Sequence, residues 1–449
     1  MQKLVISKQF MGVKPCEIEL NRFLLLIGEQ ASGKSTIAKL IFFFQTLPDA
    51  IYENSVLAYS KSEIFDFNIH INQMVRQKFL ETFGSTSRNK GFELHFDYGD
   101  ISYLKVSQGR DNLTYAGFET NFGYHIGGVI KLYLNSARFD NHVDEIPSRQ
   151  QLRQELDTLF FRKTTVHTYL IAGRSALVAY PETFEKVVEK EYEKLLEDEV
   201  KEQDFEKRQR LGNERLLYQF VQWSKGVRNI FKINGQSFNQ VAKNLINKEA
   251  TNKIQKIAVK ILKGTYESTE WGERIKLIDN NISIPLKDAS SGQQEVLRLL
   301  QGVFLSLGLQ NRKEFFVVEE PEAHLYPLAQ KELINAFAVF LNTIPQGRMI
   351  VTTHSPYILA CINILLFAHY VSNEIEQQNL NGSIDYVPRD FWLDSSFFNA
   401  YSLGQSETYC VNIKDTVTGL IDQNYLDAIS EQLGLEYQGL YNLLTEPTL

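Results

Sequence analysis

A loop bounded by two glycines carries the residues of this sequence best suited to bind a phosphate group. Gly28–Ser35 reads GEQASGKS and matches the pattern G-x-x-x-x-G-K-[ST]. Glycine lets the backbone pass close to an anion, and the first turn of a following helix offers it unpaired N–H groups. Lys34 would reach the β- and γ-phosphates of a nucleotide, and the Ser35 hydroxyl would hold Mg²⁺. The alternative is a glycine-rich turn that binds nothing, but the lysine, the serine and the preceding apolar run together argue against it.

Two carboxylates and a histidine follow two other apolar runs. Glu319 and Glu320 come directly after Phe315–Val318, and His354 comes after Met349–Thr353. In a phosphate-loop ATPase, Mg²⁺ needs a carboxylate at the end of a neighbouring buried strand. Glu319 fits that role, Glu320 could deprotonate the attacking water, and His354 could hydrogen-bond the γ-phosphate or that water. A purely structural role is unfavourable for the two glutamates, because burying them without a cation is costly.

The elements that would position these groups follow an α/β pattern. Residues 3–27 alternate between apolar and polar and then become continuously apolar at Phe23–Ile27, which predicts two edge strands and a buried strand that enters the loop. A helical pattern begins at Ile37. Residues 274–278 and 282–286 read as a β-hairpin that leads to Ala289–Glu295, where another helix begins.

Two further segments are rich in charge. Residues 182–206 read as an exposed helix with many acidic residues and a narrow apolar stripe, to which we assign no chemistry. Four lysines with helical spacing then share one face of a later helix: Lys253, Lys256, Lys260 and Lys263. They form either a solvated face of an amphipathic helix or a docking surface for nucleic acid or an acidic partner.

Composition excludes several classes of protein. The chain has 449 residues, of which 43% are hydrophobic and 22% charged, and its net charge of −7 argues against a uniformly basic surface. The N-terminus lacks the apolar core of a signal peptide, and we expect no membrane-spanning helix. The three cysteines are scattered and odd in number, as in a reducing compartment without a disulfide framework or zinc site. We therefore expect a cytoplasmic protein.

The order of these motifs resembles the heads of ABC-type ATPases. It is more narrowly similar to prokaryotic ATPases related to the overcoming-lysogenization-defect (OLD) and SMC proteins, in which EEPEAHL is followed by TTHSP. The resemblance implies an α/β fold, with a mixed sheet, N-terminal β-strands and a helical insertion, and ATP and Mg²⁺ as ligands. Glu319 corresponds to Walker B, Glu320 to the catalytic glutamate and His354 to the switch histidine. The nucleotide-binding positions, including the Walker A loop and the signature motif, are Gly28, Ser32, Gly33, Lys34, Ser35, Thr36, Ser290, Gly292 and Gln293.

The sequence departs from the family pattern at several points. Glu319 replaces the commoner Walker B aspartate, and Ser291 replaces a glycine of the signature. The glutamine that usually contacts Mg²⁺ is not obvious, and Gln73 and Gln77 are the candidates. The insertion is too short for a long coiled coil. No acidic G…DxD pattern follows His354, so we expect no nuclease domain of the OLD type.

These observations predict an ATPase head in three parts: residues 1–175, a helical insertion over 176–270, and residues 271–449. By resemblance, two copies would engage through their ATP-bound heads, and the chain would be an ATP-driven switch of a prokaryotic antiphage defence system. A separate nuclease or toxin would be its effector. The alternatives are a DNA-repair or chromosome-maintenance ATPase that acts directly on DNA, and an ATP-gated scaffold with low turnover.

Overall fold

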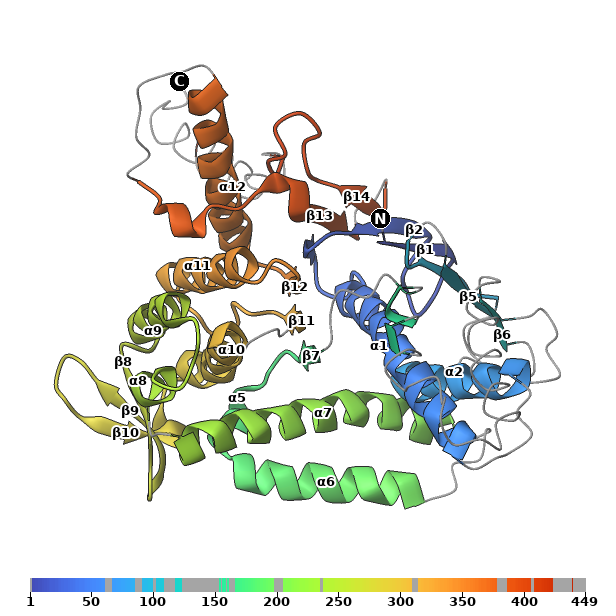
Figure 1. The fold of residues 1–449 in the computed structure, drawn as a ribbon, viewed down its shortest axis with the longest axis horizontal. Coiled ribbons are helices and arrows are strands. Elements are labelled where there is room, and N and C mark those ends of the chain that lie inside the picture. Colours follow the sequence, from blue (N-terminus) through green and yellow to red (C-terminus); the bar gives the residue numbers. More distant parts are fainter. Residues whose placement is uncertain are drawn as a thin grey trace, which may run out of the picture.

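A computed structural model gives the fold of the chain (Figure 1). It describes residues 2–60, 67–84, 91–99, 102–108, 118–122, 153–154, 156–158, 160, 166–197, 205–234, 237–308, 314–377, 386–404, 408–422 and 438.

A six-stranded sheet forms the centre of the molecule. Its order is β14-β13-β3-β12-β11-β7, and all neighbours are parallel except β14, which is antiparallel to β13. The strands are β3 (Phe23–Gly28), β7 (Val166–Leu170), β11 (Glu314–Glu319), β12 (Arg348–Thr353), β13 (Phe398–Leu403) and β14 (Cys410–Asn412). The central strands are almost wholly apolar because helices cover both of their faces. Their carboxyl ends meet at one edge, where Gly28, Glu319 and Thr353 lie.

One face of this sheet packs on α1 (Lys34–Ser60), with Leu24, Leu26 and Val317 in a shared core. The other side of α1 is covered by a five-stranded antiparallel sheet of order β2-β1-β4-β5-β6, in which Phe96 stacks on Phe44 of the helix. Its strands are β1 (Gln2–Lys8), β2 (Cys16–Leu20), β4 (Glu93–Asp97), β5 (Tyr103–Gln108) and β6 (Phe118–Phe122). The expectation of two edge strands was wrong for β1, which pairs with both β2 and β4. Its apolar–polar alternation reflects one covered face, not an edge.

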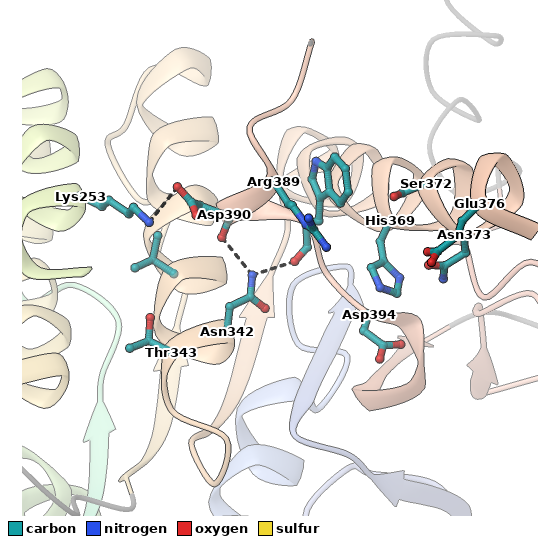
Figure 2. A pocket seen from close by; sticks show the side chains of 12 residues that line it. Lys253, Asn342, Thr343, His369, Ser372, Asn373, Glu376, Arg389, Asp390 and Asp394 are labelled. Atoms are coloured by element: carbon teal, nitrogen blue, oxygen red, sulfur yellow. Dashed lines mark hydrogen bonds and ion pairs between the residues drawn. The ribbon is translucent and has the colours of Figure 1, made fainter. Parts of the chain in front are cut away.

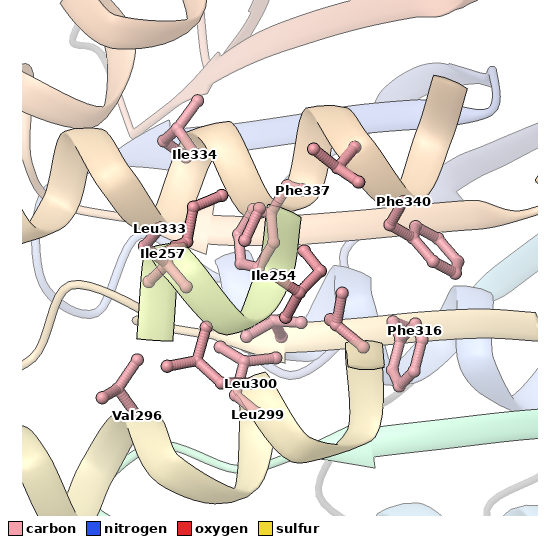
Figure 3. Close-up of a cluster of buried hydrophobic side chains, with 14 of the residues drawn as sticks. Ile254, Ile257, Val296, Leu299, Leu300, Phe316, Leu333, Ile334, Phe337 and Phe340 are labelled. Atoms are coloured by element: carbon pink, nitrogen blue, oxygen red, sulfur yellow. The ribbon is translucent and has the colours of Figure 1, made fainter. Parts of the chain in front are cut away.

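Three helices cover the opposite face of the central sheet (Figure 3). They are α9 (Lys248–Leu262), α10 (Ser291–Gly308) and α11 (Pro327–Thr343). Ile254 and Ile257 of α9 pack against Leu300 of α10 and Phe337 of α11. The apolar stripe of the lysine-bearing helix is therefore part of the main core, although this helix lies within the expected helical insertion.

The rest of residues 176–270 forms smaller layers. Helices α6 (Pro181–Glu197) and α7 (Phe205–Asn234) lie side by side along one border of the molecule (Figure 1). Their partners are α2 (Phe67–Phe83), which packs on α7, and the short helices α5 (Ser175–Ala179) and α8 (Phe238–Ala242). Part of the acidic face of α6 is paired, because Glu185 forms an ion pair with Arg228 of α7.

The expected β-hairpin is confirmed as β9 (Gly272–Leu277) and β10 (Ser283–Pro285), which join β8 (Gly264–Thr269) in a three-stranded sheet. A 3₁₀ turn, η1 (Leu286–Asp288), then delivers the chain to α10.

Among the described residues, one helix, α12 (Pro356–Gln377), has the length and the apolar composition that could cross a membrane. The expectation that no such segment exists overlooked it. Core helices pass the same test, and α12 packs on α11 with Ile358, Leu359 and Ile362 fully buried. The 3₁₀ turns η2 (Arg389–Phe391) and η3 (Ser395–Phe397) then lead into β13.

Candidate functional site

The loop from Gly28 to Gly33 joins the end of β3 to the start of α1, as the sequence predicts. Gly33 has φ of 92°, which only glycine adopts without strain. A Cβ at Gly28 would lie 2.3 Å from the carbonyl oxygen of Leu403 on β13, so this glycine is also required by close packing. The first N–H groups of α1 lack partners within the helix and form an anion-binding end.

Lys34 is the first residue of α1 and is folded back over the loop. Its Nζ donates to the carbonyl oxygens of Gly28 (2.9 Å) and Glu29 (2.7 Å) and to Ser32 Oγ (3.3 Å). Burial lowers the pKa of Lys34, while Glu320 and Glu322 act in the opposite direction. An ammonium group held by carbonyl oxygens can be transferred to the oxygens of a phosphate.

Tyr409 fixes the loop from outside. Its hydroxyl donates to the carbonyl oxygen of Ser32 at 2.6 Å, and burial raises its pKa, which keeps the hydroxyl protonated as a donor. The same hydroxyl would lie 2.5 Å from a Cβ at Gly33. The loop conformation thus depends on a residue just before β14.

His354 connects Lys34 to Glu320. Lys34 Nζ lies 3.4 Å from His354 Nδ1, and His354 Nε2 lies 3.2 Å from Glu320 Oε1. The structure therefore brings three predicted site residues into one chain of contacts, from Lys34 through His354 to Glu320.

The loop that carries Glu320 has an unusual backbone. Glu320 and His324 adopt φ of 43° and 60°, which are uncommon for residues with a side chain. Glu322 stabilises the loop by accepting at Oε1 from the backbone N of His354 at 2.9 Å and from the hydroxyl of Thr353. The loops after β11 and β12 are thus bonded to each other.

Glu319 lies at the end of β11 with 6% of its surface exposed. Its Oε1 accepts from the hydroxyl of Tyr169 at 2.7 Å, and its Oε2 accepts from the backbone N of Ala172 at 3.3 Å. Burial, and then Glu319 itself, raise the pKa of Tyr169, so the tyrosine is a neutral donor. Because neither donor neutralises the carboxylate, a cation suits this position.

The residues present fit Mg²⁺. The exposed hydroxyl of Ser35 and the carboxylate of Glu319 are hard oxygen ligands of the kind that Mg²⁺ prefers. Within the described part of the chain, no group of three or more His, Cys, Asp or Glu residues could hold a metal by itself. Mg²⁺ would therefore be bound together with phosphate oxygens, whose charge it would neutralise.

The signature segment begins α10 beside the Walker B loop. A Cβ at Gly292 would lie 2.5 Å from the carbonyl oxygen of His324, so only glycine allows this approach. Ser290 Oγ accepts from the backbone N of Gln293, while Gln293 Oε1 accepts from the backbone N of Ser290. This reciprocal cap orders the helix start. Gln293 Nε2 also donates to the carbonyl oxygen of Leu262, so its side chain holds the segment in place, whereas Ser290 is exposed.

Neither candidate for the Mg²⁺-contacting glutamine is placed beside Walker B by a contact in the structure. Gln73 and Gln77 lie on α2, where both are exposed and Gln77 donates to Glu81. The Walker B strand lies between β12 and β7, and the residues after β7, Ile171–Arg174, contain no glutamine. This segment instead contacts Glu319 through Ala172 and Arg174.

The lysine face of α9 is partly paired with carboxylates. Lys253 forms ion pairs with Glu249 at 2.7 Å and with Asp390 at 2.8 Å, and Lys260 pairs with Glu332 at 2.8 Å. Lys253 and Asp390 border a polar cavity of about 480 Å³ between α11, α12 and η2 (Figure 2). That cavity adjoins the C-terminal end of α11, whereas the phosphate-loop site adjoins its N-terminal end. Lys256 is exposed on α9. Lys263 is exposed too, but it lies outside the expected helix face, because α9 ends at Leu262 and Lys263 is its C-cap, with a left-handed φ of 50°.

A family model described as "AAA ATPase domain" matches residues 3–359. The chain belongs to this AAA ATPase family. The search of curated proteins found no match.

Solved structures similar to this AAA ATPase include two SMC heads. An Smc head domain with an extended coiled coil bound to the C-terminal domain of ScpA, derived from Pyrococcus furiosus, is 12% identical, with a TM-score of 0.40 and coverage of 96% of this chain and 100% of that one. The SMC head domain from Thermotoga maritima is 10% identical, with a TM-score of 0.36 and coverage of 92% and 98%. A dimeric ATP-binding cassette bound to ADP and Pi is 12% identical, with a TM-score of 0.26 and coverage of 80% and 90%.

Sequence reasoning missed three residues of the site in this AAA ATPase. Tyr169, Arg174 and Tyr409 all contact the phosphate loop or Walker B, but each lies outside a recognised motif. Arg174 offered one signal, since His167–Ile171 before it reads as a strand that could have been placed beside Walker B.

Proposed function

We propose that this protein is an ATP-hydrolysing switch of a prokaryotic antiphage defence system, which works as a homodimer and controls a separate effector such as a nuclease. Support for the defence role is the order of its motifs, EEPEAHL followed by TTHSP, which resembles OLD-related ATPases. Support for the switch is the chain of contacts from Lys34 through His354 to Glu320.

Each residue of that chain has a role in ATP hydrolysis. Lys34 leaves the loop carbonyls to bind the β- and γ-phosphates, which removes its contact with Nδ1 of His354. His354 then turns towards the γ-phosphate, and Glu320 accepts the proton of the attacking water. Ser35 and Glu319 would hold Mg²⁺, which would supply positive charge against the phosphates. ATP binding thus rearranges contacts that a partner can detect.

The observation that carries the dimer is the exposed signature segment beside an apolar rim. Ser290 and Ser291 are exposed at the start of α10, whereas Gly292 is buried, and the first N–H groups of this helix can face an anion of another chain. Large side chains nearby are also exposed: 74% for Tyr326, 69% for Leu328 and 54% for Tyr357. They follow the Walker B loop and His354, so a second copy that covered them would also cover the site.

Mixing two inactive variants tests the shared site. Lys34→Ala removes the phosphate contact, and Ser290→Arg blocks the signature of the partner. In a mixed dimer with sites built from both chains, one site carries both defects and the other carries neither, so ATPase activity returns in part. If subunit exchange is demonstrated and every mixing ratio stays inactive, each site is built within one chain.

Phage challenge tests the defence role. The gene would be expressed together with the genes beside it, and the plating efficiency of a phage panel would be compared with that on cells carrying Lys34→Ala. We expect protection that the variant loses, since it cannot bind ATP. If every phage plates equally on both strains, with both proteins present at equal levels, the defence role is refuted. The assignment of ATPase activity is not affected by that result.

A further inference from the structure

Arg174 is a fully buried arginine at the end of β7, where it joins the signature helix to Walker B. Its Nη1 donates to the carbonyl oxygens of Glu319 (2.9 Å) and Ile171 (2.8 Å). Its Nε donates to the carbonyl oxygen of Glu295 on α10 at 3.1 Å, and its backbone N donates to Glu295 Oε1 at 3.1 Å. One side chain therefore contacts both the end of β11 and the second turn of α10.

The ion pair between Arg174 and Glu295 is incomplete in this conformation. Arg174 Nε lies 3.6 Å from Glu295 Oε1, although both side chains are 0% exposed. Arg174 Nη2 and Glu295 Oε2 are buried and have no hydrogen-bond partner among the described residues. Buried unpaired groups are costly, and arginine and carboxylate favour two parallel hydrogen bonds. The contact between α10 and the segment after β7 therefore keeps unused hydrogen-bonding capacity on both partners.

We propose that Arg174 is a positioning residue that transmits movement of the signature helix to Walker B, and so couples the two ATP sites of the dimer. The inference rests on the proposed function. When Ser290 and Gly292 of one chain close on the ATP of its partner, α10 moves and Glu295 pulls on Arg174. Arg174 is bonded to the backbone of Glu319, so the carboxylate in the chain's own site moves as well.

The segment around Arg174 is suited to transmit this movement. Tyr169 and Ala172 hold the two carboxylate oxygens of Glu319, and Arg174 holds its carbonyl oxygen, so β7 and the residues after it contact Glu319 at three points. A displacement of these residues cannot leave the carboxylate in place. Coupling of this kind appears as cooperativity between sites.

The test uses Arg174→Lys in the full-length protein. Lysine keeps the charge but lacks the planar fork that bonds the carbonyl oxygens of Ile171, Glu295 and Glu319 together. We expect ATP affinity to change by less than about 3-fold, because the phosphate loop is intact, while kcat falls by about 10-fold or more. The Hill coefficient for ATP, above one in the wild type, should fall to about one.

Arg298→Lys is the matched control. Arg298 is equally buried on α10 and pairs with a glutamate, Glu273, but that partner lies on β9 and not in Walker B. The control measures how much thermal stability and kcat are lost when a buried arginine pair on the same helix is disturbed. We expect it to lower thermal stability and leave the Hill coefficient unchanged. If Arg174→Lys does not fold, Glu295→Gln is measured with Glu273→Gln as its control.

The outcomes separate the inference from the proposed function. A wild-type dimer that hydrolyses ATP with a Hill coefficient of one, or an Arg174→Lys variant that matches Arg298→Lys in kcat and Hill coefficient, overturns the coupling and leaves the ATPase switch standing. A wild-type chain that stays monomeric with ATP overturns both.

Discussion

The imidazole of His354 is held from both sides, by Lys34 at Nδ1 and by Glu320 at Nε2. These two contacts thus fix the orientation of the ring before any nucleotide arrives. The contact also keeps Glu320 beside the phosphate loop, with 40% of its side chain exposed and open to a water molecule. The chemistry of the site therefore depends on whether Glu320 is the base.

Replacing Glu320 with glutamine tests that role. The amide keeps the shape of the side chain but cannot accept the proton, so we expect ATP binding to persist while turnover falls by about 10²- to 10⁴-fold. Calorimetry would measure binding, and phosphate release would measure turnover. Glu249→Gln, on the exposed start of α9, is the control for a lost carboxylate. Turnover at the wild-type rate in Glu320→Gln would move the role of base to another residue.

At the residue scale, the sequence predicted those site residues that belong to one contiguous motif. The position of Lys34 at the start of α1 and the position of Glu319 at a strand end follow from single motifs. Arg174 and Tyr409 could not be predicted, because their contacts depend on which strands lie side by side. For the same reason, Gln73 and Gln77 were the candidates, although β7 and β12 are the strands that flank Walker B.

At the scale of elements, the four lysines at α9 fall into two pairs that differ in their contacts. Lys253 and Lys260 already bind carboxylates, whereas Lys256 and Lys263 are exposed. If this face docks duplex DNA, Lys256→Glu with Lys263→Glu should weaken binding more than Lys253→Glu with Lys260→Glu, and should flatten its salt dependence by about two phosphate contacts. Fluorescence anisotropy at several salt concentrations would measure both. Absent wild-type binding, or binding that is unchanged in both variants, would show that the lysines form no DNA-docking face.

A second prediction concerns the packing of α2 against α7. Burial, and then Arg215 of α7, lower the pKa of Lys78 to about 8. Because this pKa is below that of the unfolded chain, the charge on Lys78 destabilises the fold at neutral pH, and stability recovers as pH rises from about 8 towards 10.5. Lys78→Met should therefore raise the free energy of unfolding by about 1–3 kcal/mol at pH 7.

Urea denaturation at pH 7 and pH 10 would measure this effect. The advantage of Lys78→Met should shrink at pH 10, where lysine is largely neutral in the folded protein. Lys8→Met, at a side chain that is 55% exposed, is the control and should change little. An equal gain at both pH values would mean that added apolar contact, and not charge burial, stabilises the variant.

At the scale of the whole molecule, the apolar rim beside the site predicts a change of mass with ATP. Glu320→Gln traps the ATP-bound state, so its mass should rise from the 51.8 kDa of one chain to that of a dimer. Light scattering after size exclusion would measure it, with Lys34→Ala plus ATP as the monomeric control. A variant that binds ATP and remains monomeric would contradict the engaged dimer.

The sequence predicted the α/β class and the strands that carry Walker A and Walker B, since continuous apolar runs indicate buried parallel strands. It did not predict how deeply α9 is buried. A helix with one apolar stripe has the same sequence pattern whether it covers a core from outside or packs between other helices. The burial of Ile254 and Ile257 between two helices is a property of the assembled layers.

The bond from Tyr409 to Ser32 joins residues that are 377 positions apart, and β3 lies between β12 and β13, which are translated hundreds of residues later. A nascent chain that has exposed its phosphate loop has therefore not yet made the strands that flank it. The ATP site can be completed only when almost all of the described chain has left the ribosome. Contacts of such long range form late in folding, so a chain that ends before β13 lacks the strand and the tyrosine that hold the phosphate loop.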